Sequence, residues 1–215
     1  MATQFFLRGV LLFDNTIDTT TPETFNDLDG LSLLTTRGAA AATGGRVSTP
    51  AGPTAGLICG ATPSLLNAIA WLSFRVNAFT LSGSITANLR MSENAMANNI
   101  GAQLVVERRD LNGAIISVVA NSEKGTELGT NEAAQNWAIT PTSTAFADGD
   151  RISISVCFND AGGTMAAGAT CNLWWDGPTS GASGDSYVTF TETITEFVAA
   201  DRVPRFSPYP QLLAH

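Results

Sequence analysis

The chain has 215 residues and a formal net charge of −8, with 14% charged residues and a single lysine, Lys124. Globular domains usually have about 25% charged residues, so a mostly neutral surface is expected here. The shortage of basic residues disfavours nucleic-acid binding, and no apolar run reaches the roughly 18 residues that span a membrane.

Residues 1–69 are expected to hold N-terminal strands followed by an extended arm. Apolar runs at 5–13 and 31–36 predict strands, and Arg8 within the first run argues against a signal peptide. A short helix is expected at 63–70.

The arm is predicted at 37–56, where the sequence is rich in Ala, Gly, Thr and Pro. This stretch has no apolar periodicity and cannot bury a core by itself. It is either a flexible linker or an arm that becomes ordered against another subunit. Arg37 and Arg46 are its candidate contact residues.

Residues 70–198 show repeated strand patterns and no long helical pattern. The clearest alternation is in RISISVCF, where Ile152, Ile154, Val156 and Phe158 share one face. The alternating pattern in SITANLRM places Ile85, Ala87, Leu89 and Met91 together in the same way. Asn112-Gly113 predicts a hairpin turn. Glu192 interrupts the last apolar alternation, which indicates a bulge or a change of neighbouring strand.

This succession of strands and turns predicts an all-β fold, an antiparallel β-sandwich of jelly-roll type. A TNF-like or carbohydrate-binding-module-like roll would have the same pattern. Residues 199–215 form a Pro-rich C-terminal tail that cannot supply a central strand. Its apolar residues, among them Phe206 and Tyr209, are expected to pack against a neighbouring subunit.

The sequence offers little catalytic chemistry. The only histidine, His215, is the last residue, which removes Ser-His-Asp and Cys-His catalysis and His-ligated metals. Glu192 with Glu196 would lie about 13 Å apart on a straight strand, too far for glycoside hydrolysis. Asp148 and Asp150 are typical of a turn. We therefore expect no enzyme activity, no cofactor and no resident metal.

A structural calcium ion is the alternative that the loop carboxylates leave open. The aspartates at loop ends are Asp148, Asp150, Asp160, Asp176 and Asp185. The cysteines are expected to be reduced and buried. Of the three, Cys157 and Cys171 are predicted on neighbouring strands.

Trp174 and Trp175 are adjacent, so on a strand their side chains point to opposite faces. One indole is expected in the core and the other at the surface. The outer indole is then a simple rim residue, a subunit contact, or a platform for a sugar.

Two stretches, FADGDRISISVCFNDAGG and LWWDGPTSGASGDSYVTFTETI, resemble structural proteins of tailed-bacteriophage virions. In those proteins a GDR-I-I strand precedes an aromatic-Asp-Gly loop and a final GDSYV-F-E-I strand. The matching residues here are Gly149, Asp150, Arg151, Ile152, Ile154, Asp176, Gly177, Gly184, Asp185, Tyr187, Val188 and Phe190. The resemblance covers about the last 120 residues and implies a jelly-roll virion component.

The expectation from this resemblance is a capsid decoration or cement protein that stabilises the phage head, assembled in the host cytoplasm. Its partners would be the major capsid protein and copies of itself, with a trimer as one arrangement. Contacts would come from residues 1–13, 37–56 and 201–215. The alternative is a neck, tail or fibre component that binds a carbohydrate receptor.

Overall fold

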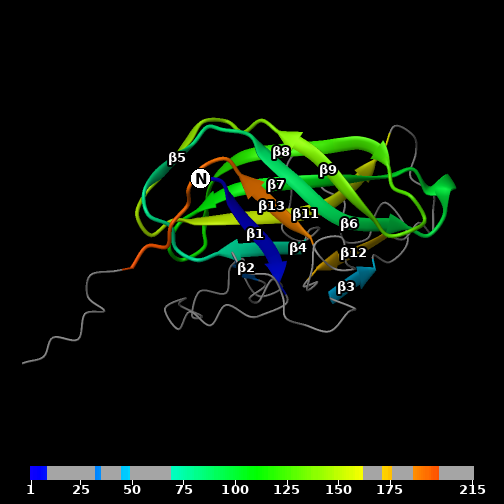
Figure 1. Ribbon diagram of the computed structural model, residues 1–215, viewed down its shortest axis with the longest axis horizontal. Helices are drawn as coiled ribbons and strands as arrows, with labels where there is room; N and C mark the ends of the chain where they lie inside the picture. The colour runs from blue at the N-terminus through cyan, green and yellow to red at the C-terminus, as the bar shows by residue number, and fades with distance from the viewer. Residues whose placement is uncertain (9–31, 35–44, 49–68, 162–170, 176–185, 199–215) are drawn as a thin grey trace, which may run out of the picture.

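The computed structural model describes residues 1–8, 32–34, 45–48, 69–161, 171–175 and 186–198 (Figure 1). These residues form thirteen strands and one short 3-10 helix. The strands are β1 (Thr3–Arg8), β2 (Ser32–Leu34), β3 (Gly45–Ser48), β4 (Ile69–Ser73), β5 (Phe79–Leu81), β6 (Ile85–Glu93), β7 (Ile100–Arg109), β8 (Ile115–Glu127), β9 (Ala133–Ile139), β10 (Thr144–Phe146), β11 (Arg151–Asp160), β12 (Cys171–Trp175) and β13 (Tyr187–Phe190), and the helix is η2 (Met96–Asn98).

Eleven of the strands make one sheet in the order β3-β12-β6-β13-β1-β2-β4-β11-β7-β8, and β9 pairs with β6 beside this path. Every pairing in it is antiparallel except that of β2 with β4. Trp137 of β9 donates a hydrogen bond to Ser122 of β8 at 3.3 Å, so the sheet folds over on itself. In Figure 1, β6, β9 and β13 lie in front of β7 and β11. The predicted all-β, jelly-roll-like sandwich is confirmed.

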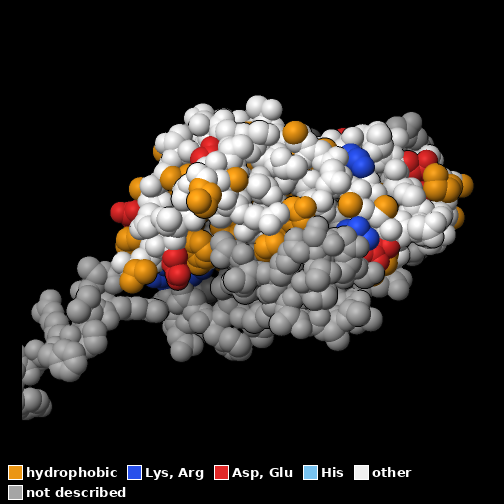
Figure 2. All heavy atoms as spheres, in the orientation of Figure 1, with side chains coloured by type: hydrophobic (Ala, Val, Ile, Leu, Met, Phe, Trp, Pro, Cys, Tyr) orange, Lys and Arg blue, Asp and Glu red, His pale blue; other side chains and the backbone are white. Residues whose placement is uncertain are grey.

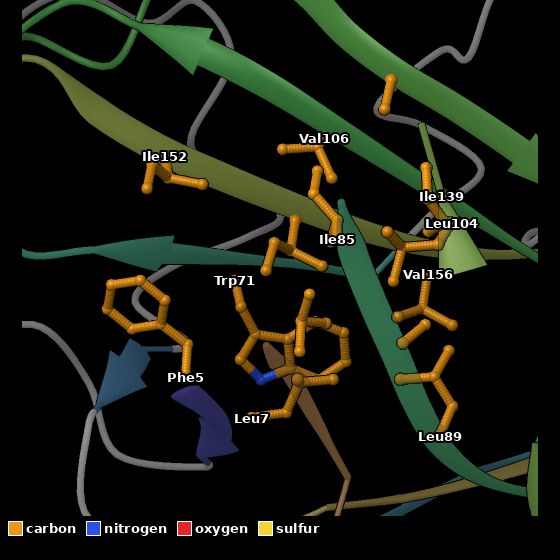
Figure 3. Close-up of a cluster of buried hydrophobic side chains, with 14 of the residues drawn as sticks. Phe5, Leu7, Trp71, Ile85, Leu89, Leu104, Val106, Ile139, Ile152 and Val156 are labelled. Atoms are coloured by element: carbon orange, nitrogen blue, oxygen red, sulfur yellow. The ribbon is translucent and has the colours of Figure 1, made fainter. Parts of the chain in front are cut away.

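The core lies between these layers. The predicted inward faces of β6 and β11 are both buried, and they meet side chains from β1, β4 and β7 (Figure 3). Trp71 and Phe5 are fully buried beside them. The alternation of apolar residues therefore predicted the core correctly, because each strand has one face toward the opposite layer.

The second face of β7 and β11 is buried too, although it is largely polar. Gln103, Glu107, Arg109, Ser153 and Ser155 are each almost fully buried. Glu107 accepts a hydrogen bond from Arg109 at 2.5 Å, and Arg109 also donates to the carbonyl of Gly113 at 2.9 Å. Buried charges need such partners, since desolvation otherwise outweighs any gain.

The N-terminal strands belong to the same sheet as the rest of the chain. β1 lies between β13 and β2, and its Phe5 and Leu7 are part of the core. The sandwich expected at 70–198 therefore also takes in residues of 1–69. Phe5 and Leu7 are core residues, and the contact role expected for 1–13 stays a prediction for the other residues of this range. β3 pairs with β12 of its own chain, so residues 45–48 of the expected arm form a strand. The rest of 37–56 lies outside the described residues.

Two expectations near the ends of the core need correction. Ile69 and Ala70 begin β4, so the helix expected at 63–70 does not include them; residues 63–68 lie outside the described residues. The last strand, β13, ends at Phe190 and does not continue through Glu192. Glu192 instead accepts hydrogen bonds from the N–H groups of Ser82 and Gly83, and Glu196 forms a bridge with Val76. At Glu192 the chain still lies beside β1, since the N–H of Thr3 donates to its carbonyl at 3.0 Å, and the neighbour has changed by Glu196, after the position where the sequence predicted it.

Candidate interaction surfaces

Trp174 lies on β12, which runs between β3 and β6. Cys171 and Leu173 of this strand are buried in the core, whereas Asn172 and Trp174 are half-buried on the opposite face. Trp174 is thus the outward-facing indole of the predicted pair. The side chain of Trp175 lies outside the described residues.

The sheet register brings Trp174 next to two arginines. Arg46 of β3 and Arg90 of β6 occupy the positions directly opposite Trp174 on either side. Directly opposed residues in an antiparallel pair share one face of the sheet. Arg90 forms an ion pair with Glu132 at 3.0 Å. Of the predicted contact residues, Arg46 and Trp174 are therefore adjacent along the sheet, while Arg37, Phe206 and Tyr209 lie outside the described residues.

Ser186 fixes the backbone on which Trp174 stands. Its hydroxyl donates to the carbonyl of Trp174 at 2.5 Å and accepts from the N–H of Arg90 at 2.8 Å. Its own carbonyl accepts from the N–H of Leu7 at 3.0 Å. One buried serine therefore joins β12, β6 and β1, and holds the indole on a rigid part of the sheet.

A second surface lies at the hairpin between β7 and β8, and the sequence analysis did not identify it. Asp110 accepts hydrogen bonds from the N–H groups of Asn112 and Ala114, and Gly113 has a positive φ of 88°, as the Asn-Gly signal predicts. In this turn and in the strand after it, four large apolar side chains are 45–49% exposed: Leu111, Ile115, Ile116 and Val118. We call these four residues the apolar hairpin.

Strand β8 exposes these side chains because of its position and its bulges. It is the last strand of the sheet path, and its pairing with β7 shifts register between Arg108 and Arg109 and between Val106 and Glu107. The register shift between Arg108 and Arg109 makes Ile116 the extra residue of a bulge, and both Ile115 and Ile116 are exposed. This end of β8 therefore extends beyond the layer that could cover it. The run GAIISVV carried the signal, because it is apolar without alternation.

Two aspartates just before β11 hold the turns around them. Asp150 accepts hydrogen bonds from the Arg108 guanidinium at 2.6 Å and from the N–H of Ala147 at 2.7 Å. Asp148 accepts from the N–H of Ala78 at 2.6 Å. The interpretation of these two residues as turn residues is confirmed. Among the described residues no group of three or more His, Cys, Asp or Glu side chains could hold a metal ion.

Glu93 at the end of β6 is the most perturbed carboxyl. Burial, and then the nearby charge of Glu127, raise its pKa to about 7, although the N–H of Ile100 donates to it at 3.3 Å. Glu127 at the end of β8 accepts from the N–H of Asn99 at 3.2 Å. The two carboxyl groups therefore hold neighbouring backbone N–H groups of one turn, in which Asn99 has a positive φ of 53°.

Cys171 is a buried thiol beside this pair, and burial followed by the charge of Glu93 raises its pKa. β12 pairs with β3 and β6, whereas β11, which carries Cys157, pairs with β4 and β7. The expectation that Cys157 and Cys171 lie on neighbouring strands is therefore wrong. The side chain of Cys157 and the whole of Cys59 lie outside the described residues. No helix within the described ranges is long and apolar enough to cross a membrane.

No family model matches the chain, and no curated protein matches it. Several solved structures share its fold. One is a CocE/NonD family hydrolase from Staphylococcus aureus, with 9% identity, a TM-score of 0.52, and coverage of 91% of this chain and 37% of the hydrolase. An aminopeptidase from a marine-sediment Thaumarchaeota archaeon has 10% identity, a TM-score of 0.56 and the same coverage.

An alpha-amino acid ester hydrolase is similar at 10% identity and a TM-score of 0.54, covering 87% of this chain and 35% of the other. The chain thus spans little more than a third of the length of these neighbours. At such identities the likeness shows the fold alone: the sandwich is one that occurs as a part of hydrolase chains.

Proposed function

We propose that this protein is a non-enzymatic structural subunit of a tailed-phage virion, a decoration or cement protein on the head. It would stabilise the head through contacts with the major capsid protein and with copies of itself. The observation that carries the proposal is the apolar hairpin. Four large apolar side chains exposed together on a turn and the edge strand that follows it are typical of an interaction site.

The neutral surface supports an assembly role. On the face shown in Figure 2, uncoloured and apolar atoms predominate, with few Lys or Arg side chains. Desolvating charged groups is costly, and the cores of stable interfaces are accordingly depleted of charges. The desolvation cost is therefore small when another protein covers a surface of this kind.

The absence of enzyme activity is part of the proposal. The carboxylates of Glu107, Asp150 and Glu192 each accept hydrogen bonds that hold strands or turns together. The hydrolase neighbours match over about a third of their own length and share only the fold, so they give no reason to propose their activities here. The sequence resemblance to virion proteins is the reason to propose a phage virion as the assembly.

The first test is quantitative mass spectrometry of purified particles from the natural source. A copy number comparable to that of the major capsid protein is expected for a decoration protein. A few copies per particle would place the chain in the neck, tail or fibre, and absence from particles would refute the virion assignment.

The second test replaces Ile115 and Ile116 with Ser in particles that carry the full chain. We expect the double variant to fold but to leave the particles, because the apolar contact is lost. Thr126→Ser, an exposed change at the far end of β8, is the matched control. Normal attachment of the double variant would show that the apolar hairpin is not the contact.

A carbohydrate-binding tail or fibre component is the second candidate, and the geometry of Trp174 is the reason to keep it. A half-buried indole on a rigid strand, with Asn172 on its own strand and Arg90 opposite, resembles a sugar platform in its chemistry. Titration of tryptophan fluorescence with host glycans should then give a saturable change that Trp174→Ala removes. No change with any host glycan would exclude this candidate.

A further inference from the structure

The last described residues of the chain lie at the same end of the sandwich as the apolar hairpin. The N–H of Phe197 donates to the carbonyl of Arg75 at 2.7 Å, and the N–H of Val76 donates to the carbonyl of Asp150 at 2.8 Å. Asp150 in turn holds Arg108, the residue next to the end of β7, at 2.6 Å. Residues after Val198 therefore start at the same end of the sandwich as the β7–β8 turn (Figure 1).

The apolar hairpin is chemically suited to an uncharged, apolar partner. No charged residue occurs between Asp110 and Glu123. The four side chains remain exposed in the single chain, Leu111 in the turn and the other three at the start of β8. The simplest partner that can bury these apolar side chains is thus a second copy of the chain.

The stretch 201–215, DRVPRFSPYPQLLAH, is rich in apolar residues, and it is uncharged from Phe206 to Ala214. It carries Val203, Phe206, Tyr209, Leu212 and Leu213, and three prolines that favour an extended backbone. An extended segment loses little conformational freedom on binding, so its aromatic and aliphatic side chains contribute more of their burial energy to affinity. From Val198 to Phe206 an extended chain reaches about 25 Å.

We propose that the apolar hairpin of one copy binds residues 201–215 of a second copy. This rests on the proposed structural role and names the contact through which copies assemble. Because the segment leaves the sandwich at the end that carries its binding surface, two copies that meet there can each give one segment and receive one. Such an exchange is self-complementary and closes under two-fold symmetry.

The test uses the full chain in solution, with the photoreactive residue benzoylphenylalanine at position 116. Chains made in light and in heavy nitrogen are mixed before illumination, and cross-linked peptides are identified by mass spectrometry. We expect cross-links from position 116 to residues 201–215 that join a light to a heavy peptide. The same photoreactive residue at position 126, about 33 Å away along β8, is the control and should not reach that segment.

Cross-links that join only peptides of equal isotope would show that each copy binds its own segment, and would overturn the exchange. Cross-links to other segments, or none, would overturn the site itself. Phe206→Ser should lower the cross-link yield severalfold without changing the melting temperature, whereas Ser207→Ala should leave the yield unchanged. Since no particle is involved, this result is independent of whether the chain is found in virions.

Discussion

Strands β6 and β8 are both rich in apolar residues, yet the structure uses them in opposite ways. Ile85 of β6 is completely buried, whereas Ile115 and Ile116 of β8 are each 45% exposed. β6 has β9 along one edge and β12 and β13 along the other, and β8 is the last strand of the path. The same side chain therefore stabilises the fold in one strand and remains available to a partner in the other. Whether such a side chain is buried or exposed depends more on the position of its strand in the sheet than on the apolar content of the strand.

The strongest test of this contrast compares one residue type at the two places. Ile85→Ala should lower the free energy of unfolding by about 2–5 kcal/mol, because it leaves a cavity in the packed core. Ile116→Ala should lower it by less than about 1 kcal/mol. Denaturant unfolding of the isolated chain measures both, and equal losses would show that the apolar hairpin is part of the folding core.

The far ends of the two strands meet at Glu93 and Glu127, which gives a pH dependence. The pKa of Glu93 is about 7 in the folded protein against 4.5 ordinarily, so the folded state binds more protons between these values. The contribution of Glu93 to the free energy of unfolding should therefore be fully present below about pH 4.5 and be lost as the pH rises through 7. The full effect is at most about 3 kcal/mol.

Glu93→Gln is the matched variant for this prediction, since the amide keeps the shape but cannot ionise. Its free energy of unfolding should vary less between pH 5 and pH 8 than that of the unmodified chain. The same slope in both proteins would place the pH dependence elsewhere.

Glu192 holds the backbone just before β6. Its contribution to the free energy of unfolding should be smaller than the two effects above. Burial acts to raise the pKa of Glu192, but hydrogen bonds from the N–H groups of Ser82 and Gly83 outweigh it and lower the pKa. The stabilisation is present above the ordinary pKa and is lost as the pH falls. Glu192→Ala should cost about 1–3 kcal/mol at neutral pH. The exposed Glu196→Ala is the control, and a similar loss there would argue against this role.

The smallest effect is expected on the outward face of β6. Arg90 and Glu132 form a partly buried ion pair on this face. Such a pair contributes little, about 0–1 kcal/mol at exposed sites, because the cost of desolvating both charges offsets their attraction where they are covered. Arg90→Gln should therefore change the melting temperature little at any salt concentration. A large loss would mean that the face around Trp174 contributes to folding, and would weaken its interpretation as a binding surface.

Local patterns predicted part of this structure well. Alternation in β6 and β11 identified their core faces, and Asn112-Gly113 identified the hairpin, because both signals depend on neighbouring residues alone. The placement of Arg46 opposite Trp174 depends on pairing between β3 and β12, which are over a hundred residues apart. The exposure of Ile115 and Ile116 depends on where the opposite layer ends. Neither property is encoded within a few residues.

The pairing of β1 with β13 also constrains how the protein folds as it is made. Phe5 finds its neighbour in β13 only when Val188 and its strand have been synthesised. At about 5–20 residues per second the first strand waits roughly 10–40 s for its partner. During that time its apolar side chains need protection from other nascent chains. Closing so long a loop also makes folding slow, so the N-terminal strand should be among the last to dock.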